Sequence, residues 1–152
     1  MQQPKLKLTE WTNTMSVGIA VLDRDHQKIF GLIREMNTIM EAGTGQATGV
    51  IEAAILEVID YTDYYFRREE LLMEVCDYPY LENHRQVHEM MKERTAGFLK
   101  VYQHDRTAFL PEKFIRFMED WWTDHIMGMD KGYQSWMEGK AEDIEHALAD
   151  RS

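Results

Sequence analysis

The sequence has little cysteine: Cys76 is the only one in 152 residues. A single cysteine cannot close an internal disulfide, and it excludes a metal site built from several thiolates. A lone cysteine is usually a small buried apolar residue. We therefore assign Cys76 no chemical role.

Positive charge is also scarce. The chain has 17 Lys and Arg against 27 Asp and Glu, a formal net charge of −10, and no run of basic residues. Such a surface repels phosphate backbones and anionic lipid over most of its area. We expect no nucleic-acid partner.

Long apolar runs are missing as well. No segment approaches the roughly 18 apolar residues of a membrane span, and residues 1–8 have no apolar stretch of the signal-peptide type. We therefore expect no membrane association and a cytoplasmic location. A length of 152 residues with 44% hydrophobic residues favours a single compact domain.

Four long segments carry apolar residues at every third or fourth position, the pattern of helices that bury one face. The segments are 23–43, a second from about residue 50 to a break before Pro79, a third from His84 through residue 103, and a fourth with Pro111 in its first turn. Short connections cannot carry the chain to the far end of a bundle about 30 Å long, so neighbouring helices should be antiparallel. The predicted fold is all-α: an up-down-up-down antiparallel four-helix bundle.

Two flanking segments differ from the bundle. Residues 1–22 lack a helical period and predict an ordered N-terminal arm that packs Trp11 and Val17 against the domain. The bundle itself is expected over 23–135. Residues 136–152 form a charged, short C-terminal helical tail with few apolar residues.

Seven side chains are candidate metal ligands, and four of them, Glu69, His84, His88 and His125, lie on the faces that should point inward. Tyr65 and Glu69 are four residues apart, as are His84 and His88, so the β-carbons of each pair lie about 5 to 6 Å apart on one helix face. The set is His26, Tyr65, Glu69, His84, His88, His125 and Asp130. One buried histidine is usually a hydrogen-bonded core residue, but several unpaired buried polar groups would cost about 1 to 3 kcal/mol each. A shared metal pair removes that cost. The other two histidines, His104 and His146, lie in a loop and a polar tail and are predicted to be surface residues.

These residues resemble a known family, the hemerythrins of the bacterial type, over roughly residues 10 to 135. The motifs that carry the resemblance are His26, the run Tyr61-Thr62-Asp63-Tyr64-Tyr65-Phe66-Arg67-Arg68-Glu69-Glu70, Tyr78-Pro79, His84 with His88, and Trp121-Trp122-Thr123-Asp124-His125-Ile126 with Asp130. The resemblance implies two non-haem iron ions bridged by carboxylates and an oxo or hydroxo group. It places His84, His88 and His125 on one iron, Glu69 and Asp130 between the irons, and His26 on the second iron.

Metal identity rests on the resemblance alone. Histidine and carboxylate ligands also accept Mn, Co and Zn, so the residue types by themselves leave the metal open. In the family the second iron has one further histidine and an open position where O2 binds. Tyr65 stands at the position of that histidine.

Tyr65 is the most consequential departure from the family pattern. A phenol has a reference pKa of about 10, but a ferric ion can remove its proton, and a hard phenolate favours Fe(III) over Fe(II). That preference would oppose simple oxygen carriage, which needs the ferrous pair. Alternatively Tyr65 points away and leaves water on the second iron, or it is a hydrogen-bonded core residue in a site with one metal or none.

Three functions remain open on these residues. The first is a binding protein for O2 or a related ligand such as peroxide or NO, used in sensing, storage or delivery, and not an enzyme. The second is a di-iron redox enzyme, a peroxidase, oxidase or diatomic reductase. The third is a metal-poor interaction bundle. Sensing would need an output through a protein partner or a homo-oligomer.

Overall fold

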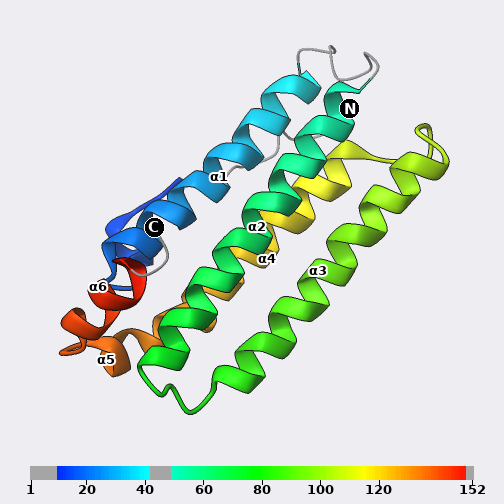
Figure 1. The fold of residues 1–152 in the computed structure, drawn as a ribbon. Helices are drawn as coiled ribbons and strands as arrows, with labels where there is room; N and C mark the ends of the chain where they lie inside the picture. Colours follow the sequence, from blue (N-terminus) through cyan, green and yellow to red (C-terminus); the bar gives the residue numbers. More distant parts are fainter. Residues whose placement is uncertain (1–9, 42–48, 150–152) are drawn as a thin grey trace.

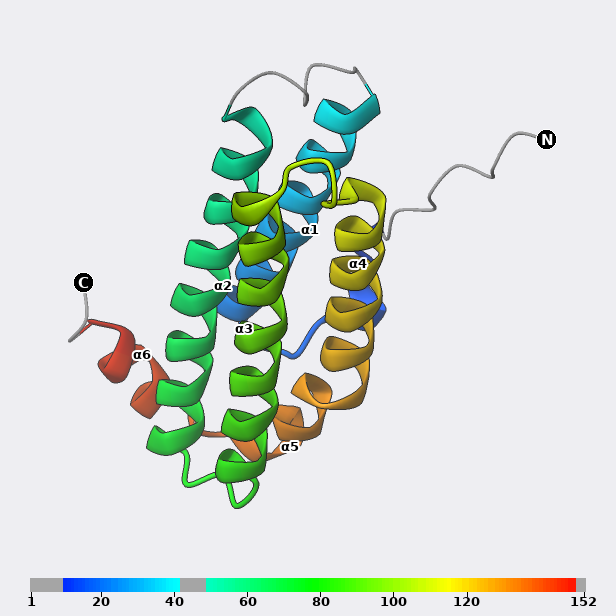
Figure 2. The same ribbon diagram turned by 90° about the vertical axis from the view of Figure 1, so that its right-hand side faces the viewer.

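The computed structural model describes residues 10–41 and 49–149, and within them the chain forms four long helices. These are α1 (Ala20–Glu41), α2 (Val50–Val75), α3 (Leu81–His104) and α4 (Pro111–Gly128). Figures 1 and 2 show the four helices side by side, with consecutive helices running in opposite directions. The predicted antiparallel four-helix bundle is confirmed.

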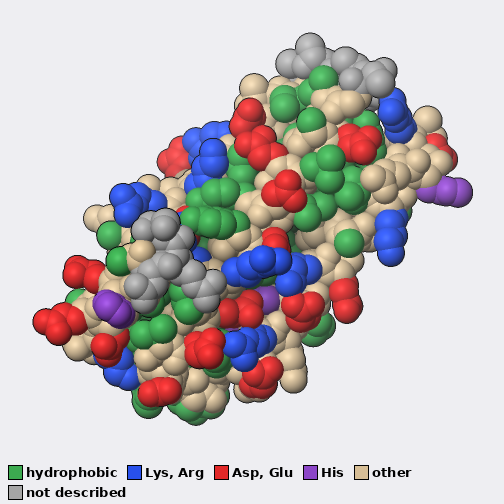
Figure 3. Space-filling view, viewed as in Figure 1, with side chains coloured by type: hydrophobic (Ala, Val, Ile, Leu, Met, Phe, Trp, Pro, Cys, Tyr) green, Lys and Arg blue, Asp and Glu red, His purple; other side chains and the backbone are tan. Residues whose placement is uncertain are grey.

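Short elements extend the bundle at the two ends of the chain. They are η1 (Asn13–Met15), η3 (Asp130–Tyr133), α5 (Gln134–Met137) and α6 (Ala141–Ala149). No helix in the described part of the chain is both long and apolar enough to cross a membrane. Acidic and basic side chains are intermingled over the face seen in Figure 3.

Local sequence signals explain where the helices start and stop. Pro111 opens α4 at a position where the missing N–H costs no helical hydrogen bond. After α2 the chain turns at Asp77, whose φ of 55° lies in the left-handed region that a short polar side chain tolerates. The connection from α2 to α3 is therefore tight, and it sets the two helices antiparallel.

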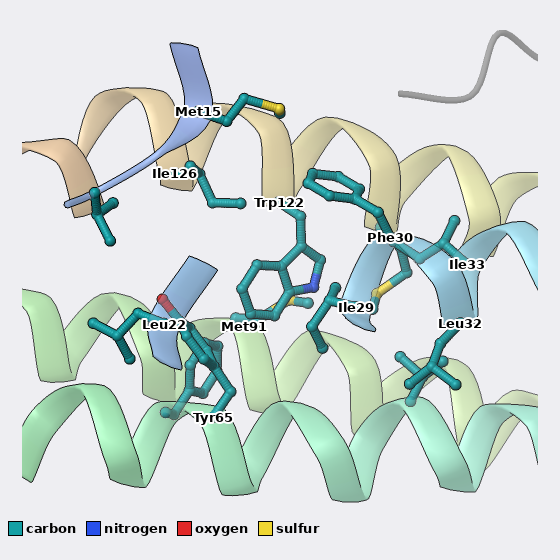
Figure 4. Packing of buried hydrophobic residues seen from close by; sticks show 14 of the residues in the cluster. Met15, Leu22, Ile29, Phe30, Leu32, Ile33, Tyr65, Met91, Trp122 and Ile126 are labelled. Atoms are coloured by element: carbon teal, nitrogen blue, oxygen red, sulfur yellow. The ribbon is translucent and has the colours of Figure 1, made fainter. Parts of the chain in front are cut away.

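The interior is filled by apolar and aromatic side chains from all four helices (Figure 4). Trp122, Tyr65, Phe66 and Phe114 are among its largest fully buried side chains. Such side chains bury large areas and set most of the packing energy. The polar cluster described below lies beside these aromatics, near the end of the bundle where α4 passes into η3.

The arm and the tail both pack on the bundle. Val17 is fully buried and Trp11 lies against the core, as predicted for the arm, but α1 starts at Ala20 and not at residue 23. Ser16 Oγ and the Val17 N–H donate to the Asp23 carboxylate, 2.6 and 2.9 Å away, so Asp23 anchors the arm inside the first turn. The predicted end of this helix at residue 43 lies outside the described residues.

The tail is helical, as predicted, and is less solvated than its charge suggests. Ile144 on α6 is buried, and α6 packs against α2. Lys140 Nζ donates to the Cys76 carbonyl oxygen at 2.7 Å, and Trp136 Nε1 donates to the same oxygen. The boundaries proposed for arm, bundle and tail stay predictions.

Candidate metal centre

The structure brings all seven predicted side chains into one buried cluster. Each is at most 4% exposed, and they come from α1, α2, α3, α4 and η3: His26, Tyr65, Glu69, His84, His88, His125 and Asp130. Their ligand atoms form two groups, each within 4.8 Å: Glu69 with the three histidines of α3 and α4, and His26 with Glu69 and Asp130. Glu69 belongs to both groups.

Three imidazoles converge on one point. The Nε2 atom of His125 lies 3.2 Å from Nε2 of His84 and 3.2 Å from Nε2 of His88. Two nitrogens bound at about 2.1 Å to one cation at right angles are about 3.0 Å apart. The spacing of the three nitrogens therefore suits ligands of a single ion.

Glu69 presents a different neighbour to each carboxylate oxygen. Oε1 lies 2.7 Å from His84 Nε2 and 3.0 Å from His88 Nε2, yet no group in the described residues is aligned with it for a hydrogen bond. Oε2 accepts hydrogen bonds from the hydroxyls of Tyr65 and Tyr133, the latter at 2.8 Å. The carboxylate thus faces both halves of the cluster.

The two carboxylate oxygens of Asp130 also face different partners. Its Oδ1 lies 2.9 Å from Nε2 of both His84 and His125, and its Oδ2 lies 3.1 Å from Nε2 of His26. Asp130 reaches this position because α4 ends at Gly128 and η3 turns the chain back over the bundle end. Two carboxylates that each contact both halves of the cluster are the arrangement that bridging ligands need.

Tyr65 points into the cluster and not away from it, so the alternative in which it leaves the site is wrong. Its hydroxyl contacts His26 Nε2 and Glu69 Oε2 and lies 2.9 Å from Asp130 Oδ2. Its ring packs edge-on against Trp122, with centroids 5.4 Å apart. Burial, together with the charges of Asp130 and Glu69, raises the pKa of Tyr65 well above its usual value, so the metal-free protein holds a neutral phenol.

Aromatic rings hold two of the histidines in place. Phe66 stacks on His88 with centroids 3.8 Å apart and an interplanar angle of 7°, and Trp121 stacks on His125 at 4.3 Å and 16°. Stacking restricts rotation about the side-chain torsions. Both imidazoles are therefore fixed before any ion binds.

Two further residues of the site were not found from the sequence. Tyr133 is fully buried and donates to Glu69, and Glu70 lies 2.8 Å from Nδ1 of His88. In the sequence Tyr133 reads as one of several apolar tail residues, although its position three residues after Asp130 is a usable signal. Glu70 reads only as the neighbour of Glu69.

The donor set fits a pair of cations. Glu69 Oε1 is buried among the histidine nitrogens and has no hydrogen-bond partner in the described residues. Burial lowers the histidine pKa values, but the contacts with Asp130 and the negative charges of Asp130 and Glu69 outweigh it and raise the pKa of His84 to about 10 and of His125 to about 9. The two carboxylates thus require positive charge beside them, which protons supply in the metal-free protein and cations would supply in the loaded one.

A family model described as "Hemerythrin HHE cation binding domain" matches residues 17–137. The chain belongs to the hemerythrin family. It is 30% identical over 128 residues to the bacteriohemerythrin of Stenotrophomonas maltophilia, a match that covers 84% of this chain and 80% of that protein. It is 28% identical over 123 residues to the bacteriohemerythrin of Pseudomonas aeruginosa, covering 81% of this chain and 77% of that one.

A solved structure agrees with this assignment. The crystal structure of a hemerythrin point mutant aligns with a TM-score of 0.74 and 25% identity, covering 88% of this chain and all of that one. Hemerythrin-family proteins hold a non-haem di-iron centre, and the His, Glu and Asp cluster found here can hold metal ions. The family resemblance seen in the sequence is confirmed.

Proposed function

We propose that this hemerythrin-family protein holds two iron ions in the buried cluster and binds O2, or a related small ligand such as NO or peroxide, for sensing, storage or delivery. The observation that carries the proposal is the division of ligand atoms into two groups joined by Glu69. The family of the chain supports iron as the metal. When bound, the iron pair would supply a redox-active Lewis acid with a coordination position for a small ligand.

The side chains have separate roles in this proposal. His84, His88 and His125 would hold one ion, and His26 with Tyr65 would hold the other. Glu69 and Asp130 would bridge the ions, since each directs one oxygen to each half of the cluster. Tyr133 holds Glu69 Oε2 by donating a hydrogen bond to it.

Tyr65 is proposed as a ligand because its hydroxyl already lies among the ligand atoms of His26, Glu69 and Asp130. A neighbouring cation favours loss of the phenol proton, against the effect of the two carboxylates. The resulting phenolate would stabilise Fe(III) relative to the imidazole it replaces. Binding that depends on a long-lived ferrous pair would therefore be weaker than in a protein with histidine at this position.

The same observation favours a second candidate, a di-iron oxidoreductase such as a peroxidase, an oxidase or a reductase of small diatomics. A centre biased toward the ferric state suits turnover better than carriage. Steady-state reduction of peroxide by an electron donor separates the two. A rate well above that of free iron supports the enzyme, and a rate equal to it supports the binding protein.

Metal content and the electronic spectrum test the leading proposal directly. After expression with added iron, the purified chain should contain about two irons and absorb in the visible. Less than one metal per chain would contradict the proposal, and would favour an interaction bundle in which the site has decayed. Manganese or zinc in place of iron would keep the site and change its chemistry.

A further inference from the structure

Nδ1, the outer ring nitrogen of His88, lies 2.8 Å from Oε2 of Glu70. Because an ionised carboxylate can only accept, His88 is the donor. Glu70 Oε1 in turn accepts a hydrogen bond from Arg85 Nε at 3.3 Å, and Arg85 also lies 3.0 Å from Glu82. A chain of charged contacts therefore leads from the buried centre to the surface.

Neighbouring positions on two helices build this chain. Glu69 and Glu70 are adjacent on α2 and therefore point in different directions. The Glu69 side chain is fully buried in the metal centre, and the Glu70 side chain lies beside it and is 22% exposed. Arg85 and His88 are three residues apart on α3 and share a face. As α2 and α3 pack side by side, both meet Glu70.

His88 is held from two directions by α2. Glu70 fixes the ring edge, and Phe66, four residues earlier on the same helix, stacks on the ring face. By contrast, Nδ1 of His26 and Nδ1 of His125 are buried and have no hydrogen-bond partner in the described residues. The imidazoles of the cluster are thus supported unequally.

The Glu70 carboxylate lies between two partners on α3: Oε2 faces His88 Nδ1 and Oε1 faces the Arg85 guanidinium. A carboxylate that accepts from a metal-ligating histidine fixes the tautomer and makes the opposite nitrogen more basic. For His88 that opposite nitrogen is Nε2, which faces His125 and Glu69.

We propose that Glu70, held by Arg85, is a positioning residue that fixes His88 in its ligating tautomer and whose negative charge biases the metal centre toward the oxidised state. The inference rests on the proposed function, because it assumes that Nε2 of His88 binds metal. Glu70 would act on the ion held by the three histidines, and Tyr65 on the other ion. The two side chains would therefore favour the ferric state from opposite halves of the cluster.

A plain cross-link between α2 and α3 is the competing explanation of the same contacts. It predicts lower thermal stability on mutation and no change at the metal. Replacing Glu70 by Gln separates the two readings, because the amide oxygen still accepts from Nδ1 but carries no charge. Replacing Glu70 by Ala removes both the acceptor and the charge.

The experiment uses the full chain loaded with iron, and measures metal retention against a chelator and the ferric/ferrous midpoint potential. Glu70→Ala should weaken metal binding about 10- to 100-fold. Glu70→Gln should bind metal within a few-fold of wild type, with a midpoint potential shifted upward. Arg85→Met should shift the potential downward, because the charge of Glu70 is then less compensated.

Glu82→Gln is the matched control, since Glu82 contacts Arg85 at the surface and its side chain is 72% exposed. It should leave both metal retention and potential unchanged. If the two Glu70 variants match this control at the metal and lose only thermal stability, the inference is overturned while the proposed function stands. If wild type itself takes up no iron, the proposed function fails and the inference fails with it.

Discussion

The phenol oxygen of Tyr65 lies 2.9 Å from Oδ2 of Asp130, on the side of the cluster that His26 occupies. Tyr65 is fully buried, and its hydroxyl contacts the carboxylates of Glu69 and Asp130 and no solvent. In a metal-free protein this arrangement requires the phenol to act as donor. Under the proposed function the same oxygen would be a ligand once a cation is in place, which is why several tests of the site depend on Tyr65.

Removal of the hydroxyl should change the colour of the protein. If Tyr65 binds ferric iron, the oxidised protein shows a broad phenolate-to-iron absorption in the visible that Tyr65→Phe lacks. Tyr64→Phe is the matched control, because Tyr64 is 49% exposed and its ring lies against Arg68. Identical spectra for wild type and Tyr65→Phe, at equal iron content, would remove the ligand assignment.

Replacing the phenol by an imidazole should favour the reduced centre. We expect Tyr65→His to form a longer-lived oxygenated protein than wild type, because a neutral ligand stabilises Fe(III) less than a phenolate does. The measurement is absorbance through repeated cycles of anaerobic reduction and exposure to O2. No gain in lifetime over wild type would mean that Tyr65 is not what limits O2 binding.

The sequence was sufficient for the bundle and for the pairs Tyr65/Glu69 and His84/His88, because these follow from periodicity within single helices. The roles of His26 and Asp130 rested on the family resemblance. The separations 65/69 and 84/88 each place two side chains on one face, whatever the neighbouring helices do. Glu70 could not be assigned in this way. Its contact with His88 depends on how α2 and α3 are rotated about their axes, which single-helix spacing does not determine.

Tyr133 and Ile144 were missed for a related reason. Both follow α4, where short elements change the direction of the chain, so no helical period relates them to the core. The structure buries both, one against Glu69 and the other beside α2. Prediction therefore ends where a contact depends on how separate elements pack together and not on spacing within one of them.

Metal should stabilise the fold. Because the ligands come from five elements, ions that bind only the native state add stability of RT ln(1 + [L]/Kd), about 2.7 kcal/mol when free metal is 100 times Kd. For a chain of this size that corresponds to a rise in Tm of roughly 5 to 10 °C. Thermal unfolding with iron and with a chelator measures the difference.

The variant His125→Ala is the control for that measurement. It removes a ligand of the three-histidine group, so its Tm should depend much less on metal. An equal Tm for wild type with and without metal would show that the cluster does not bind ions tightly under those conditions.

Asp25 links the fold to the site from outside the cluster. This carboxylate is 3% exposed, precedes His26 in the chain, accepts from the Tyr61 hydroxyl at 2.7 Å, and lies 3.2 Å from Arg68 Nη1. Burial raises the pKa of Asp25, against the effects of Tyr61 and Arg68, which lower it. The two partners thus offset part of the cost of a buried charge between α1 and α2.

Removing one partner should therefore destabilise the chain. Tyr61→Phe should lower the free energy of unfolding by about 1.5 kcal/mol, the usual size for a hydrogen bond to a charged group. Tyr64→Phe, on the exposed side of α2, should change it by less than about 0.5 kcal/mol. Denaturant unfolding of the metal-free proteins separates the two values. Because Asp25 adjoins His26, Tyr61→Phe should also weaken metal retention slightly. If Tyr61→Phe is as stable as wild type, Arg68 alone supports the buried carboxylate.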